Sequence, residues 1–124
     1  MKNLTILTIF LFTSFALSGQ DLKGIVNSIE KGDLSQVEPL LDDLVDYCFD
    51  DYQDLLDKGE FIAKLKGAVS TIDPKSSEII HSADSTKGGT KYIVAKLIGA
   101  SGLNYRMYVY TENSKIIEIR FNKE

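Results

Sequence analysis

The chain has 124 residues and a formal net charge of −4 at pH 7, which is enough for one domain and too short for two. A mildly acidic balance disfavours binding to nucleic acid, which depends on basic surface, and to anionic membrane surfaces. Cys48 is the single cysteine. No disulfide can therefore form within the chain, and we expect the thiol of Cys48 to be buried.

The first nineteen residues are typical of a cleaved signal peptide. Lys2 gives a positive start, Leu4–Phe15 is apolar, and a small-x-small cleavage pattern follows. The apolar run is shorter than the roughly 20 residues of a membrane span. Gln20 stands where a lipoprotein box requires cysteine, so we expect no acyl anchor.

These features predict a signal peptide over residues 1–19 and a single α+β domain over residues 20–124. The protein would be exported, periplasmic or secreted, soluble and without a membrane anchor. The alternative is that the first residues form a buried helix or strand.

The first half of the domain has two helix signals. Apolar residues recur at helical spacing over Asp21–Lys31, and Gly32 marks the end of that helix. Asp33 is then expected to cap a short second helix. Its apolar stripe would consist of Leu34, Val37, Leu40 and Leu41.

Two interpretations are open for residues 42–56. We favour a strand at Val45–Phe49, followed by a short strand or a turn over Tyr52–Leu56. The helical alternative would place four aspartates in one row, where like charges repel. Those aspartates are Asp42, Asp46, Asp50 and Asp54.

A capping box at Asp57–Glu60 predicts a helix that runs to about Ile72, where Asp73-Pro74 ends it. Residues 77–86 are then expected to form a strand, joined by the Lys87-Gly88-Gly89 turn to a three-strand meander.

The meander consists of Lys91–Ile98, Leu103–Tyr110 and Lys115–Asn122, which are rich in Ile, Val, Tyr and Phe. Because alternate residues of a strand face opposite sides, one uncharged set is assigned to the core: Ile93, Ala95, Leu97, Tyr105, Met107, Val109, Ile117, Ile119 and Phe121.

Loop lengths fix the expected strand register. A three-residue loop at residues 100–102 sets Leu97 opposite Tyr105. A three-residue loop at residues 112–114 sets Met107 opposite Ile119. Both registers keep the apolar set on one side of the sheet.

The order of elements and turn signals resembles the nuclear transport factor 2-like, cone-shaped (cystatin-like) fold. The resemblance rests on the Lys31-Gly32-Asp33 junction, the acidic strand, the capped helix after Asp57 and the Gly-Gly hairpin. These features are also similar to a family of small exported bacterial proteins classed only as a domain of unknown function. The resemblance implies helices on one face of a curved antiparallel sheet, and it implies no particular activity.

Few residues suggest chemistry. Seven aspartates lie between Asp42 and Asp57, but the segment lacks the Gly and Glu of a calcium loop, so we expect a solvated acidic edge, no metal and no cofactor. His81 is the single histidine, and the sequence does not fix which face of the sheet it takes. Tyr47, His81 and Tyr105 are candidate pocket residues, and no catalytic residue is assigned.

The outer face of the sheet carries residue types that are enriched in protein interfaces. In the expected register Lys96, Arg106 and Arg120 line up across three strands beside Tyr108. We therefore expect a non-catalytic binding or interaction module. It would use either the cone pocket for a small apolar ligand, or this outer face for a protein partner or a second copy in a homodimer. The alternatives are an ordinary amphipathic face, and a small pocket enzyme acting on an apolar substrate with isomerase- or hydrolase-like chemistry.

Overall fold

The computed structural model describes residues 20–84 and 89–124. The signal peptide expected over residues 1–19, the end of the predicted strand at residues 85 and 86, and Lys87-Gly88 of the predicted turn lie outside the described residues. Within the described residues, none of the helices is long and apolar enough to cross a membrane.

Six strands form one sheet in the order β2-β1-β6-β5-β4-β3. Strand β1 runs parallel to β6, and every other neighbouring pair is antiparallel. The sheet is therefore mixed, whereas we expected it to be antiparallel throughout. The strand bounds are β1 Leu41–Phe49, β2 Tyr52–Asp57, β3 Pro74–Asp84, β4 Thr90–Gly99, β5 Asn104–Glu112 and β6 Lys115–Lys123. The strand interpretation of residues 45–49 is therefore confirmed, and residues 52–57 form a sixth strand.

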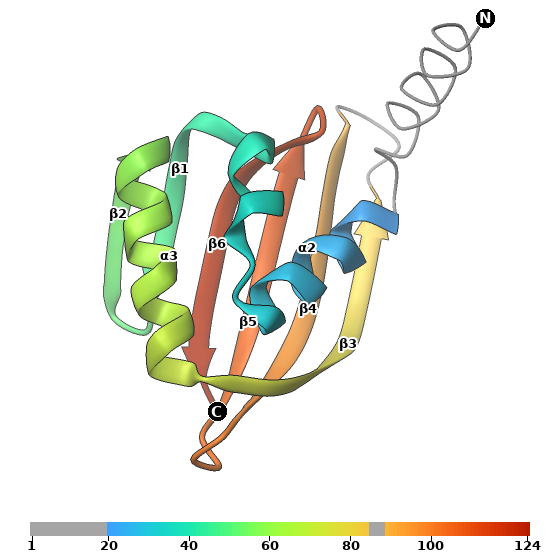
Figure 1. The fold of residues 1–124 in the computed structure, drawn as a ribbon. Helices are drawn as coiled ribbons and strands as arrows, with labels where there is room; N and C mark the ends of the chain where they lie inside the picture. Colours follow the sequence, from blue (N-terminus) through green and yellow to red (C-terminus); the bar gives the residue numbers. More distant parts are fainter. Residues whose placement is uncertain (1–19, 85–88) are drawn as a thin grey trace, which may run out of the picture.

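Two helices and two 3-10 turns cover the same face of this sheet (Figure 1). Helix α2 (Gln20–Lys31) packs on β3 and β4, whereas α3 (Lys58–Ile72) packs on β1 and β2. The predicted cap of α3 is present, because the backbone N–H of Glu60 donates to Asp57 Oδ1 at 2.9 Å. At the other end, Asp73 adopts φ 47° and ends the helix.

The second predicted helix is wrong in type. The segment forms two separate 3-10 turns, η1 (Leu34–Gln36) and η2 (Glu38–Leu40). Asp33 makes no capping bond with its side chain, since its Oδ1 accepts from the Ser35 hydroxyl at 2.6 Å. Pro39 lies in the first turn of η2 and has no N–H to continue a helix.

The core lies between the sheet and the covering helices. Eight of the nine side chains that we assigned to the core from the meander are buried, and they pack with apolar residues of α2 and α3. The exception is Ile117, which is half-buried, whereas its neighbour Ile116 is fully buried.

The predicted register between β5 and β6 is wrong by two residues. Asn113 and Ser114 both have positive φ, 52° and 68°, as a two-residue type I′ turn requires, so the loop is shorter than we expected. A bulge at Ile117 then restores the apolar pattern. Met107 consequently faces Phe121 instead of Ile119, whereas the predicted pairing of Leu97 with Tyr105 is confirmed.

Candidate functional site

Two of the three pocket candidates lie on the helix-covered face of the sheet. The Tyr47 ring contacts Phe61 edge-on, with the ring centroids 6.0 Å apart. The Tyr105 ring lies against Phe49 at 5.2 Å. Both tyrosines are buried. Phe49 and Tyr47 line the same shallow hollow of about 250 Å³ beside α3, so Phe49 lies between the two candidates.

Both hydroxyls have weakened acidity. Burial, with a smaller effect of Tyr52, raises the pKa of Tyr47 to about 12. Burial, with a smaller effect of Asp50, raises the pKa of Tyr105. Both phenols therefore remain protonated at neutral pH, as is usual for tyrosines packed in a core.

His81 lies apart from these tyrosines. It is exposed on the edge strand β3. The register shifts between Ile79 and His81, and the shift sets His81 opposite Val94. Val94 alternates with the core residues Ile93 and Ala95, so His81 shares the outer face of the sheet.

Aromatic rings form a ladder across the outer face. The His81 and Tyr92 ring centroids are 5.6 Å apart, and the Tyr92 and Tyr110 centroids are 5.7 Å apart. The ladder crosses three neighbouring strands, β3, β4 and β5.

The basic residues of this face are arranged differently from our expectation. Lys96 and Arg106 are opposite one another, as predicted. Arg120 is opposite Tyr108, and Arg106 is opposite Asn122. The predicted row of three cations is therefore wrong, because the type I′ turn and the bulge shift β6 by two residues.

A carboxylate joins Lys96 and Arg106. Glu124 Oε2 accepts from Arg106 Nε at 3.1 Å and lies 2.9 Å from Arg106 Nη2. Glu124 Oε1 lies 3.6 Å from Lys96 Nζ. The hydrogen bond to Glu124, followed by one to Tyr108, raises the pKa of Arg106.

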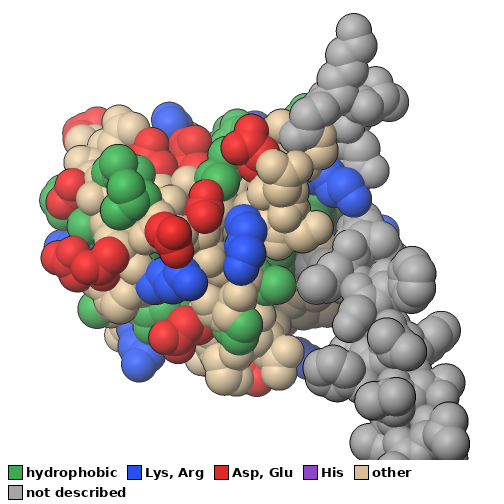
Figure 2. Space-filling view, turned by 90° about the horizontal axis from the view of Figure 1, so that it is seen from above, with side chains coloured by type: hydrophobic (Ala, Val, Ile, Leu, Met, Phe, Trp, Pro, Cys, Tyr) green, Lys and Arg blue, Asp and Glu red, His purple; other side chains and the backbone are tan. Residues whose placement is uncertain are grey.

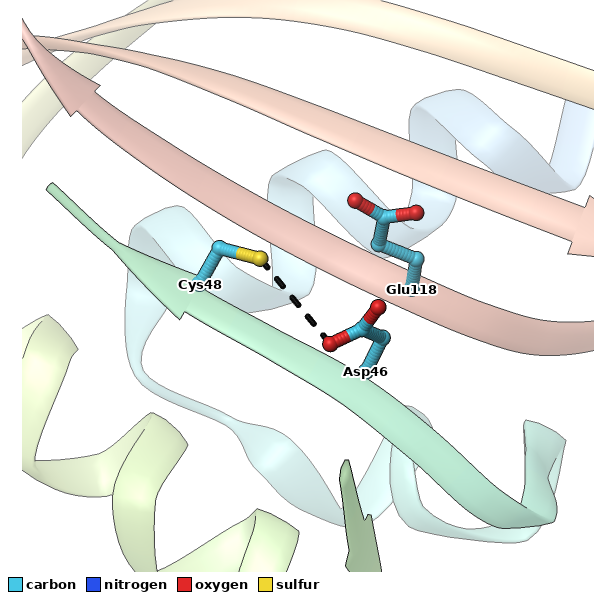
Figure 3. Close-up of side chains that lie close together, drawn as sticks. All are labelled: Asp46, Cys48 and Glu118. Carbon is cyan, nitrogen blue, oxygen red and sulfur yellow. Dashed lines mark hydrogen bonds between the residues drawn. The ribbon is translucent and has the colours of Figure 1, made fainter. Parts of the chain in front are cut away.

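A second polar group lies between β1 and β6. Asp46, Cys48 and Glu118 have potential ligand atoms within 4.8 Å of one another (Figure 3). Both carboxylates already have protein partners. Gln53 Nε2 donates to Asp46 at 3.2 and 3.3 Å, and Arg120 donates to Glu118 Oε2 at 2.9 and 3.2 Å.

Cys48 is buried, as expected, but on the outer face beside Arg120. Burial is the main cause that raises the pKa of its thiol, which keeps it neutral and poorly nucleophilic.

The seven aspartates do not form one cluster. Asp43 and Asp57 lie near the start of α3, whereas Asp50 and Asp51 form the β1–β2 turn at the opposite end of the hairpin. Figure 2, seen from above the view of Figure 1, shows acidic side chains scattered among basic and hydrophobic ones. Five of the seven aspartates are exposed, and two are half-buried, so a solvated acidic surface describes them well.

The fold of this chain, and not a functional site, indicates the class of proteins to which it belongs. Six curved strands covered on one face by helices are the α+β arrangement of nuclear transport factor 2-like and cystatin-like proteins, as we expected. The chain belongs to the family described as Domain of unknown function (DUF4783), whose pattern matches residues 22–122. No curated protein matches the chain.

Solved structures agree with this assignment. A DUF4783 family protein from Bacteroides uniformis ATCC 8492 has a TM-score of 0.73 at 18% identity, over 82% of this chain and 95% of that one. A DUF4783 family protein from Bacteroides fragilis YCH46 gives 0.71 at 20% identity, over 82% and 96%.

A protein of unknown function with a cystatin-like fold from Methylobium petroleophilum PM1 gives a TM-score of 0.62 at 13% identity, over 86% of this chain and 77% of that one. At such identities these similarities establish the fold alone.

Sequence reasoning missed two groups on the outer face. Glu124 reaches Lys96 and Arg106 only because β6 ends beside the start of β5. Asp46 and Glu118 become neighbours only through the parallel pairing of β1 with β6. Nothing local in the sequence signals either pairing.

Proposed function

We propose that this chain is a non-catalytic interaction module that pairs with a second copy through the outer face of its sheet. The main support for the proposal is the composition of the uncovered face. Within the described residues, both helices lie on the inner face. The outer face of β4 and β5 carries a lattice of tyrosines and cations, by which we mean Tyr92, Lys96, Arg106, Tyr108 and Tyr110.

That lattice has an internal symmetry. Val94 faces Tyr108 across the two strands. Tyr92 and Lys96 lie two residues on either side of Val94, and Tyr110 and Arg106 lie two residues on either side of Tyr108.

A two-fold axis along the Val94–Tyr108 row would set each tyrosine of one copy against a cation of the other. A self-complementary patch of this kind is what a symmetric dimer needs, and a cation over a tyrosine ring is attractive.

The size of the face is also suitable. Six strands about 4.8 Å apart, most of them about nine residues long at about 3.3 Å per residue, give a face of roughly 700 Å². A standard interface buries about 800 Å² on each partner. The range of standard interfaces is about 600–1,000 Å² on each partner, so nearly the whole outer face would have to be buried in the dimer.

Reversing one charge tests the proposal. Arg106→Glu should weaken the dimer more than about tenfold, because the tyrosine of the partner would then face a carboxylate. Lys66→Glu is the matched control, since Lys66 is exposed on α3 and makes the same charge change. Sedimentation equilibrium over a range of concentrations measures both. A chain that remains monomeric at high concentration, or a dimer equally stable in both variants, would refute the proposal.

A further inference from the structure

Lys96 and Arg106 place two positive charges side by side on the outer face of the sheet. The two side chains are directly opposite one another on antiparallel strands, an arrangement in which like charges repel. An anion placed between them removes that cost. Glu124 supplies the anion here, with contacts of 2.9 and 3.6 Å to the two cations.

Space for a larger group adjoins the pair. A hollow of about 380 Å³ is lined by Arg106, Tyr108, Asn122, Lys123 and Glu124. Tyr108 contributes a hydroxyl and Asn122 an amide beside the Arg106 guanidinium. Lys123 is set opposite the core residue Tyr105, so we assign its ammonium no part in the site. A guanidinium binds carboxylates through two parallel donors, which gives geometric selectivity as well as attraction.

An unsatisfied acceptor lies close by. Among the described residues Asn104 Oδ1 is the side-chain polar atom that is buried without a hydrogen-bond partner. Asn104 precedes Arg106 by two residues on β5. Its backbone carbonyl oxygen, unlike Oδ1, has a partner, since it accepts from the backbone N–H of Glu124 at 3.0 Å. A buried acceptor without a donor is costly, but Asn104 does not line the hollow, so we assign it no part in the site.

We propose that Lys96 and Arg106 form a binding site for the carboxylate of an acidic peptide, and that Glu124 is a built-in competitor for this site. The side chain of Glu124 is part of an exposed ion pair. Such pairs are weak, so an incoming carboxylate can displace it. This site lies on the face of the proposed dimer but does not depend on dimer formation.

Fluorescence anisotropy with a labelled peptide of four glutamates tests the site, at protein concentrations at which sedimentation shows the monomer. Glu124→Gln should bind the peptide about three- to tenfold more tightly than the unchanged chain, because its own carboxylate no longer competes. Glu112→Gln, an exposed position at the other end of β5, makes the same charge change and should leave the affinity unchanged. A peptide of four glutamines is the neutral probe.

Arg106→Gln and Lys96→Gln should each abolish the binding gained by Glu124→Gln, and added salt should weaken that binding. Equal affinity of Glu124→Gln and Glu112→Gln would overturn the proposal, as would binding that survives Arg106→Gln. Circular dichroism confirms that each variant folds. A chain that stays monomeric at high concentration yet binds the peptide refutes the dimer but retains the site. A chain that dimerises but shows no gain of binding in Glu124→Gln refutes the site alone, so the two proposals fail separately.

Discussion

Gly99 is the position at which one added methyl group should cost the most. It is the last residue of β4, at the start of the β4–β5 loop and close to the end of α3. A Cβ built there would lie 2.5 Å from the carbonyl oxygen of Ile72 and 2.5 Å from that of Leu103, whereas ordinary contacts are 3.4–4 Å.

Backbone hydrogen bonds restrain the positions of the Ile72 and Leu103 carbonyl groups. The oxygen of Leu103 accepts from the Gly99 N–H at 2.9 Å, and the next residue, Ala100, donates to the oxygen of Asp73 at 2.9 Å. Overpacking of this kind costs about 1–3 kcal/mol. Because both atoms belong to the backbone, we expect a value near 3 kcal/mol for Gly99→Ala, which lowers Tm by roughly 10–20 °C in a domain of this size.

Urea unfolding followed by circular dichroism measures the loss. Gly24→Ala is the control, since Gly24 lies within α2 and has no atom within 4 Å of an added Cβ. That variant should gain about 0.5–1 kcal/mol from helix propensity. A Gly99→Ala protein within about 0.5 kcal/mol of the unchanged chain would refute the steric reasoning.

Three further changes test other parts of the fold. Asp57→Ala removes the cap of α3 and should cost about 1 kcal/mol in urea unfolding; no loss would mean that the cap is not needed. Ser114→Gly relieves a positive φ of 68° and should stabilise the chain by about 0.5–1 kcal/mol, so a lower Tm would contradict the type I′ turn. Between pH 10 and about 12 the unfolded chain loses the Tyr47 proton while the native chain keeps it, so stability should fall by up to about 1.4 kcal/mol per pH unit. Tyr47→Phe should flatten that decline, and an unchanged slope would exclude Tyr47 as its source.

Local patterns predicted the elements well. The period of two across β4 and β5 places Ile93, Leu97 and Met107 in the core, because a slip of one residue would bury charge. The Asp57 cap could be read from four consecutive residues, since its hydrogen bond is local.

Pairings between distant segments could not be predicted in this way. Ser114 gave no signal of its left-handed backbone, because glycine or asparagine is usual there. The shorter turn then shifted Arg120 away from Lys96 and Arg106. The contacts of Glu124 depend on that same shift, so the outer face was predicted in composition but not in arrangement.

The parallel pairing of β1 with β6 has a consequence for folding. The first strand of the sheet completes its hydrogen bonds only against the last one, with Tyr47 beside Ile119 and Phe49 beside Phe121. Contacts that close so long a loop tend to form slowly. Residues of β6 must therefore be available before β1 can complete its pairing, and until then one edge of the β1–β2 hairpin has unpaired backbone groups, which favour aggregation.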